Sequence, residues 1–438
     1  MYDQRLSVRL IAQEARGLLT RLMRVKPYAL NMPMVPAAAV SPKAQSAIEQ
    51  HMLTEKRVLA STVKSFISWI ESRHASTLSA EAIQKRFTLM RLRFNAVLTQ
   101  FDIFADVLVQ RSEHGTGVWV SGLDSVAEDA LQVVAKFVTI PPVICHLDRG
   151  IGGAIRRART RLPGGDENPV GIIRIPRERM VGSGIASSLV HEAGHQGAAL
   201  LDLIESLRPV LMKREEIPEH GRAWRFWDLW ISEIVADLWS LGHLGLTATQ
   251  GLLAVVSLPR PFMFRISEGD PHPFPWIRVK LSCAIGNALY PHPQWARLDG
   301  AWEEMYPRQG LNLRLLTIIS ELEATMPEFI RVLLGHQPEK LKGLPLGNLF
   351  PIRRRSPQQL AAIFQESRRD RDLMHRIPPT LAFAVLGQGR AEDLITPERE
   401  SDELASLLTH WAVRSSLDTS ILCASSPAQH AGLARLTA

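Results

Sequence analysis

Residues 187–200, SSLVHEAGHQGAAL, constrain the fold of this chain more than any other stretch. The apolar residues predict a helix, in which His191 and His195, four residues apart, would be neighbours on one face. Two imidazoles placed in this way can bind one metal ion, with Zn–N bonds of about 2.0–2.1 Å. Glu192 would lie beside that face, where it can take a proton from a metal-bound water without itself binding the metal. The fold must then bring a third ligand to this helix.

Residues 230–240, WISEIVADLWS, provide candidates for the third ligand. Their apolar positions predict a buried helix, with Glu233 and Asp237 four residues apart on one face. A catalytic zinc usually has three protein ligands and one open position, so one of these carboxylates would complete the set with His191 and His195. The other would accept a hydrogen bond from a ligand histidine and fix its tautomer. The residues themselves leave open which carboxylate has which role.

Three motifs together resemble those of the gluzincin metallopeptidases, in particular the HtpX and CAAX-prenyl-protease kind. They are H-E-x-x-H, an E-x-x-A-D run that begins at Glu233, and an H-P-x-x-x-x-R-V run that begins at His272. The resemblance covers about residues 165–290 through short motifs. It implies one catalytic Zn²⁺ with Glu233 as the third ligand, and it implies Asp237 as the acceptor for a ligand histidine. Unlike the membrane-bound members, this chain has no apolar run of transmembrane length.

The same resemblance implies roles for residues outside the two helices. His272 would hydrogen-bond the oxyanion of the tetrahedral intermediate, and Arg278 would brace the site or the substrate backbone. Residues 170–175, VGIIRI, are β-like and resemble the active-site edge strand of the family. An extended substrate would then add as a further strand beside them.

The chain as a whole is expected to be mainly α (α+β), with a zincin-like core that holds a small β-sheet and the H-E-x-x-H helix. Helical N- and C-terminal regions would flank this core. An extended piece is expected at residues 115–122, bracketed by glycines, and the helix that begins near residue 185 should stop before Pro209. The expected regions are residues 1–41 (an N-terminal helix and a Pro-rich arm), 42–138 (helical), 139–335 (the zincin-like domain) and 336–438 (basic and helical, with a frayed tail).

Composition indicates an ordinary globular protein. Of the 438 residues, 46% are hydrophobic and 22% are charged, which argues against a disordered chain. The three cysteines Cys145, Cys283 and Cys423 are odd in number and far apart, which suits a reducing compartment. The charged N-terminus lacks the apolar core of a signal peptide. We therefore expect a cytoplasmic protein without a membrane span.

These observations predict a zinc-dependent metallopeptidase that hydrolyses peptide bonds, with Glu192 as general base and a protein or peptide as substrate. One alternative is an H-E-x-x-H protein that matures or modifies a single peptide or regulatory partner, because more than 200 residues lie outside the expected catalytic unit. The other is a nucleic-acid-binding protein with a structural or vestigial zinc, since the net charge is +7. Nucleic acid is not the expected partner, because no nucleic-acid-binding motif accompanies the basic clusters and Glu192 is intact.

Overall fold

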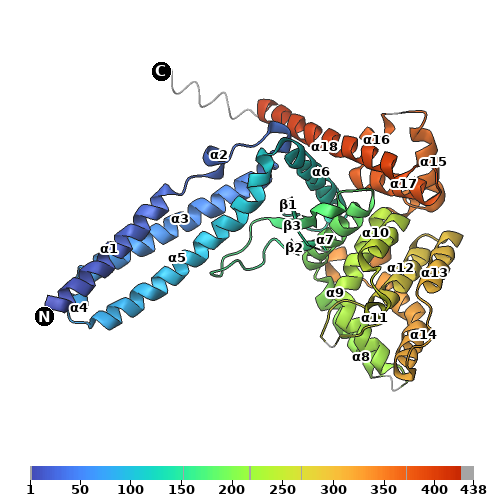
Figure 1. The fold of residues 1–438 in the computed structure, drawn as a ribbon, viewed down its shortest axis with the longest axis horizontal. Coiled ribbons are helices and arrows are strands. Elements are labelled where there is room, and N and C mark those ends of the chain that lie inside the picture. The colour runs from blue at the N-terminus through green and yellow to red at the C-terminus, as the bar shows by residue number, and fades with distance from the viewer. Residues whose placement is uncertain (1, 151, 217–218, 268, 371, 426–438) are drawn as a thin grey trace. The chain divides into compact units, whose positions relative to one another are not determined.

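The computed structural model describes residues 2–150, 152–216, 219–267, 269–370 and 372–425 (Figure 1). The described residues are mainly helical and contain one small sheet, which confirms the predicted mainly-α class. The contacts divide the chain into two compact units. Unit 1 comprises residues 1–118, 158–170 and 416–438, and unit 2 comprises residues 119–157 and 171–415. Both units are discontinuous in sequence, whereas the four expected regions are continuous ranges.

Unit 1 is built on three long helices that lie side by side, α1 (Tyr2–Arg24), α3 (Pro42–Ile70) and α5 (Ala80–Val109) (Figure 1). Ser41 and Ser79 cap α3 and α5, because each hydroxyl accepts a hydrogen bond from a backbone N–H of the first helical turn. Buried apolar residues recur every three or four positions along each helix and form the core of the bundle. Shorter pieces are α2 (Tyr28–Asn31), α4 (Arg73–Ser76) and the 3₁₀ turns η1 (Pro36–Ala38) and η2 (Gln110–Ser112).

Unit 2 holds most of the other helices around one apolar core. In chain order the remaining helices are α6 (His114–Leu131), α7 (Gly184–Leu200), α8 (Leu203–Glu215), α9 (Gly221–Leu244), α10 (Leu246–Val256), α11 (Arg260–Met263), α12 (Pro275–Leu289), α13 (Pro293–Met305), α14 (Leu313–Gly335), α15 (Pro357–Ser367), α16 (Leu373–Arg376), α17 (Pro379–Ala391) and α18 (Pro397–Ser425), with 3₁₀ turns η3 (Gln132–Val134), η4 (Arg177–Arg179), η5 (Glu339–Leu341), η6 (Leu346–Asn348) and η7 (Ile352–Arg354). Among the described residues, none of the helices combines the length and the apolar character needed to cross a membrane.

Helices α7 and α9 pack closely along one another, and glycines make this approach possible. A Cβ atom at Gly197 would lie 2.4 Å from the ring of Trp239, and one at Gly194 would lie 2.7 Å from the Cβ of Trp239. No larger side chain fits at either position without a shift of the neighbouring helix. The result is that the face of α7 that carries the two histidines lies against α9.

The sheet has three strands, β1 (Val143–Asp148), β2 (Ala154–Arg156) and β3 (Gly171–Pro176), in the order β1-β3-β2. Strand β1 pairs parallel with β3, and β2 pairs antiparallel with β3. The expected strand at residues 170–175 is therefore present as β3, but the prediction that it is an edge strand is wrong. Its two edges are taken by β1 and β2, so a substrate strand has no free edge of β3 to join.

Two other local predictions are wrong. Residues 115–122 are not extended but lie in α6. Gly122 serves close packing rather than a turn, since a Cβ at this position would lie 2.4 Å from the carbonyl oxygen of Leu408. The helix that begins at Gly184 ends at Leu200, because Asp202 takes a left-handed backbone with φ 52°. Pro209 lies inside the next helix, α8, rather than beyond the end of α7.

Candidate metal centre

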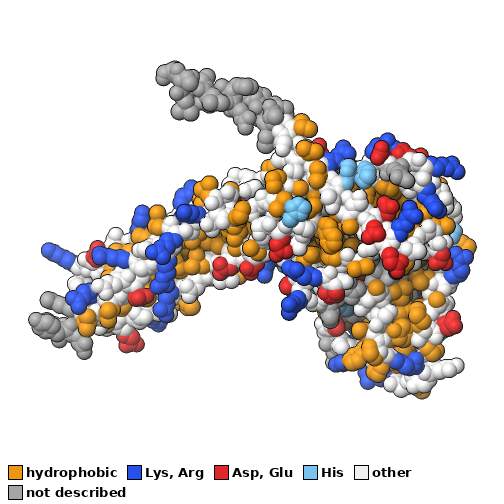
Figure 2. Space-filling model, turned by 45° about the horizontal axis from the view of Figure 1, so that its top comes forward, with side chains coloured by type: hydrophobic (Ala, Val, Ile, Leu, Met, Phe, Trp, Pro, Cys, Tyr) orange, Lys and Arg blue, Asp and Glu red, His pale blue; other side chains and the backbone are white. Residues whose placement is uncertain are grey.

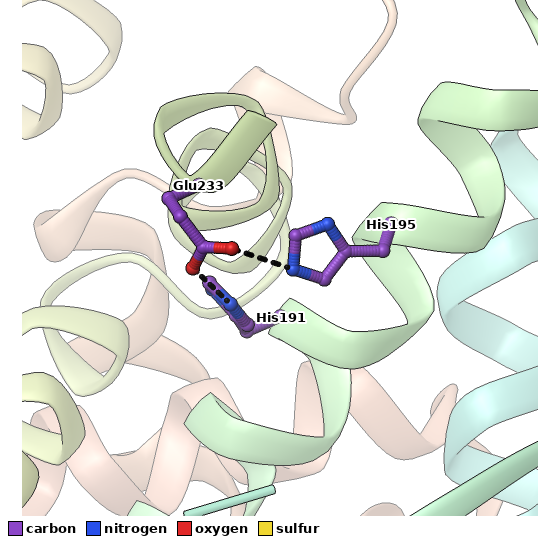
Figure 3. A group of neighbouring side chains, drawn as sticks. All are labelled: His191, His195 and Glu233. Atoms are coloured by element: carbon purple, nitrogen blue, oxygen red, sulfur yellow. Dashed lines mark ion pairs between the residues drawn. The ribbon is translucent and has the colours of Figure 1, made fainter. Parts of the chain in front are cut away.

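Three side chains from α7 and α9 converge on one point (Figure 3). They are His191, His195 and Glu233. Each offers one ligand atom, and these three atoms all lie within 4.8 Å of one another. The Nε2 atom of His191 is 3.3 Å from Oε2 of Glu233, and the Nε2 atom of His195 is 3.4 Å from Oε1. The structure thus brings together the three residues expected as ligands, in a group that could hold a metal ion.

Asp237 and Arg278 contact the ligand residues and orient their side chains. Asp237 lies one turn after Glu233 on α9, and its Oδ1 atom is 2.8 Å from Nδ1 of His191. Burial lowers the pKa of His191, but its contacts with Asp237 and Glu233 outweigh that effect and raise the pKa to about 9, so without a metal ion the imidazole is protonated. Release of the Nε2 proton, with Nδ1–H still donating to Asp237, would make Nε2 available to a metal ion. Arg278 extends from α12 and donates two hydrogen bonds to the Asp237 carboxylate, with distances of 2.7 and 2.9 Å. Its Nη2 atom also lies 3.5 Å from Glu233, so one guanidinium orients both carboxylates.

The charges of the group are set by burial and by these contacts. Burial favours the neutral form of Asp237, but the charge of Arg278 and the hydrogen bond from His191 outweigh it and lower the pKa of this carboxyl. Burial acts in the same sense on Glu233, whose pKa is also lowered by the contact with His191. For His195, burial and the charge of His191 lower the pKa to about 4. Two ionised carboxylates therefore face imidazole groups, and a cation is well accommodated there.

Glu192 lies on the same helix but is not part of the three-residue group. Its side chain is buried, and burial is the largest cause of a raised pKa for its carboxyl. Gly153, just before β2, covers it closely, since a Cβ at this position would lie 2.9 Å from Oε1 of Glu192. The sequence interpretation did not identify Gly153. The signal was the glycine pair in residues 149–157, RGIGGAIRR, where a backbone without a side chain can approach another group.

His272 lies at the outer side of the group, in the loop before α12. Its Nε2 atom is 3.3 Å from Oε2 of Glu233, while its side chain remains about half exposed. Its Nδ1 atom is 2.8 Å from Oδ1 of Asp270, which also accepts a hydrogen bond from the backbone N–H of His272. Asp270 was not identified from the sequence, although an Asp two residues before a loop residue is a frequent acceptor for that residue's backbone N–H. His272 thus faces the site with one ring nitrogen and is held by Asp270 through the other.

No protein-family model, no curated protein and no solved structure matches this chain. The likeness to gluzincins therefore rests on the three motifs, and the case for a metal centre rests on the geometry of His191, His195 and Glu233.

Proposed function

We propose that the protein is a zinc-dependent metallopeptidase that hydrolyses peptide bonds, with Glu192 as general base. The observation that carries the proposal is the convergence of His191, His195 and Glu233 beside a buried glutamate. Two imidazole nitrogens and one carboxylate form a three-ligand set that suits catalytic zinc, which keeps a further position open for water or substrate. His191, His195 and Glu233 would hold the ion.

The chain's own residues then have distinct tasks. A zinc ion at this site would lower the pKa of water and polarise the scissile carbonyl. Glu192 would take a proton from the attacking water and give it to the leaving amine, and the raised pKa of its carboxyl suits both transfers. His272, with a ring nitrogen directed at the site, would donate a hydrogen bond to the oxygen that becomes negative. Asp237 and Arg278 would act as positioning residues for His191 and Glu233.

The sheet suggests where an extended substrate would lie. In the described sheet, whose strand order is β1-β3-β2, β2 is an edge strand that pairs with β3. A peptide that adds to this edge would form main-chain hydrogen bonds with β2. It would also pass close to Gly153, which contacts Glu192. We therefore assign the alignment of the substrate to β2 instead of β3.

The test is the substitution Glu192→Gln, which keeps the size of the side chain but removes the base. Cleavage of a casein or peptide-library substrate should fall by at least about 100-fold, because general-base catalysis contributes on the order of 10²–10⁴. Zinc content should stay at the wild-type level. The matched control is Glu366→Gln, at an exposed position of α15, which should leave cleavage unchanged. An unchanged rate in Glu192→Gln would contradict the proposal.

The distribution of charge supports a second candidate, in which the same hydrolysis is confined to one dedicated partner. Residues 1–118 contain 16 Lys and Arg against nine Asp and Glu, an excess that equals the net charge of the whole chain, +7. Figure 2 shows Lys and Arg side chains along the helices of unit 1. Such a surface suits an acidic partner protein.

The inactive Glu192→Gln variant offers a way to distinguish the two candidates. A partner retained by this variant should be cleaved by the wild-type protein, whereas casein should not be. Efficient digestion of casein would contradict the dedicated-partner candidate and support the general one. The variant could instead retain nucleic acid, with binding that falls steeply as the salt concentration rises. That result would show that the basic helices bind nucleic acid, and it would contradict an acidic partner protein as their ligand.

A further inference from the structure

A cavity of about 860 Å³ lies between α12, α13 and α14 in unit 2. Its size is within the range of small-molecule sites, roughly 300–1,000 Å³. The wall formed by Trp295 is rigid: Nε1 of this residue donates a hydrogen bond to the carbonyl of Tyr290 at 2.8 Å, and a Cβ at Gly286 would lie 2.4 Å from its ring. Apolar side chains cover most of the remaining surface, among them Ala284, Ala288 and Ile330.

One end of the cavity is polar and carries an excess of negative charge. Lys280 is largely buried and donates hydrogen bonds to Asp299 at 2.8 Å and to Glu303 at 2.6 Å. Arg308 donates a hydrogen bond to Oε2 of Glu323 at 2.8 Å. In this group two cations face three carboxylates. The Oε1 atom of Glu323 is 3.9 Å from Lys280, too far for a hydrogen bond, so this oxygen can accept one from a ligand.

Two carboxylates line the cavity at this end, those of Asp299 and Glu323. They come from α13 and α14, whereas Lys280 is the one Lys or Arg among the described lining residues. A primary ammonium, with three N–H donors and a positive charge, matches an end of the cavity where carboxylates outnumber cations.

The cavity is separate from the metal centre, although α12 serves both. The cavity-lining residues of this helix, among them Lys280, Ala284 and Asn287, recur at helical spacing along one face. Arg278, which contacts Asp237 and Glu233, extends from the opposite face. A ligand in the cavity would therefore lie behind α12, away from the three-residue group.

We propose that this cavity binds an apolar molecule that ends in a primary ammonium group. The apolar body would lie against Ala284, Ala288 and Ile330, and the ammonium would lie beside Asp299 and Glu323. A molecule of the same shape with a carboxylate would meet the excess negative charge and bind more weakly. This inference does not depend on the proposed peptidase activity.

The first test uses three probes that share an eight-carbon chain and differ in the head group: n-octylamine, 1-octanol and octanoate. Isothermal titration calorimetry at pH 7 should show one saturable site for n-octylamine, with an affinity about tenfold higher than for octanoate, since a charge-assisted hydrogen bond contributes on the order of a tenfold change. 1-Octanol should fall between them. Equal affinities for the three probes, or no saturable binding of the amine, would overturn the proposal.

The second test locates the bound amine. Ala284→Phe should fill part of the cavity, and Glu323→Gln should remove one carboxylate; each should weaken n-octylamine binding by about tenfold or more. Glu304→Gln, at an exposed position of α13, is the matched control and should bind as the wild type does. Thermal unfolding confirms that each variant is folded. If folded Ala284→Phe binds n-octylamine as tightly as the wild type, the cavity is not the site.

Discussion

Helix α12 carries two cations on opposite faces, and their surroundings differ in one respect. Arg278 donates two hydrogen bonds to Asp237 and lies near Glu233, and the side chains of all three residues are at most 13% exposed. Lys280 also faces carboxylates, but Asp299, Glu303 and Glu323 are 29–38% exposed. The ion pairs are alike in composition, but the carboxylates of the second cluster are more exposed to water.

The comparison shows how burial changes what an ion pair does. In the buried cluster of Arg278, Asp237 and Glu233, the planar guanidinium fixes the positions of two carboxylates. A buried carboxylate without such a partner would be strongly destabilising. In the more exposed cluster around Lys280, solvent screens the charges, and each ion pair contributes little to stability. The first arrangement suits a site that must hold a metal ligand in one geometry, and the second leaves carboxylate oxygens available to a ligand.

The largest expected effect concerns the free energy of unfolding, which Arg278→Met and Lys280→Met should lower by different amounts. Both variants are compared in protein freed of metal by a chelator. Arg278→Met leaves two buried carboxylates without their cation and should lower the free energy of unfolding by about 3–5 kcal/mol. Lys280→Met should lower it by about 1 kcal/mol, because solvent can compensate its partners. Chemical denaturation at pH 7 measures both values. Equal losses would show that the two clusters do not differ as described.

A smaller effect is expected on metal affinity when each cluster loses an aspartate. Asp237→Asn should weaken zinc binding by about 10–100-fold, because His191 loses the acceptor that fixes its tautomer. Asp299→Asn, in the exposed cluster, should leave zinc affinity unchanged. Competition with a chromophoric chelator measures both. A loss of affinity in Asp299→Asn, or none in Asp237→Asn, would contradict the role given to the buried cluster.

Exchanging the two kinds of cation should have a still smaller effect. Arg278→Lys keeps the charge but cannot form both hydrogen bonds to Asp237, and we expect a loss of about 1–2 kcal/mol in the free energy of unfolding. Lys280→Arg should change it by less than about 0.5 kcal/mol, since the partners are partly exposed and can adjust. Denaturation of the two variants in parallel is the measurement. The reverse order would refute the argument from geometry.

The smallest effect is a pH dependence in the exposed cluster. The hydrogen bond from Lys280 lowers the pKa of Glu303, so the folded state favours the ionised carboxyl. The resulting stabilisation is present above the unfolded pKa of about 4.3 and is lost as the pH falls through the folded value. Glu303→Gln should therefore be less stable than the wild type at pH 7, by under about 1 kcal/mol. The difference should shrink as the pH falls through the lowered folded pKa of Glu303, and a difference that stays constant through the acid range would have another origin.

The sequence predicts the parts of the site that depend on helical spacing. His191 and His195 share a face because they are four residues apart, and Glu233 and Asp237 share one for the same reason. The contact between these two faces depends on Gly194, Gly197 and the ring of Trp239. No local sequence pattern predicts this contact. For Arg278 the resemblance to gluzincins implies only a residue that braces the site or the substrate backbone, and its hydrogen bonds to Asp237 are known from the structure.

Other features depend on contacts between distant residues. Strand β2 is three residues long in a glycine-rich stretch, so it leaves no alternation of apolar and polar residues to detect. The glycines of residues 115–122 look like turn residues until the backbone of Leu408 is known to pass beside one of them. The cavity beside α12 also depends on distant residues, because Trp295 from α13 and Pro327 from α14 line it together with residues of α12.

The central claim is that His191, His195 and Glu233 bind one zinc ion, and metal content tests it most directly. The wild-type protein and Glu233→Ala, purified in parallel in the presence of zinc and freed of excess metal, should be compared by inductively coupled plasma mass spectrometry. We predict about one zinc per chain in the wild type and a large loss in folded Glu233→Ala. A wild type without zinc, or a variant with the same zinc content as the wild type, would contradict the claim.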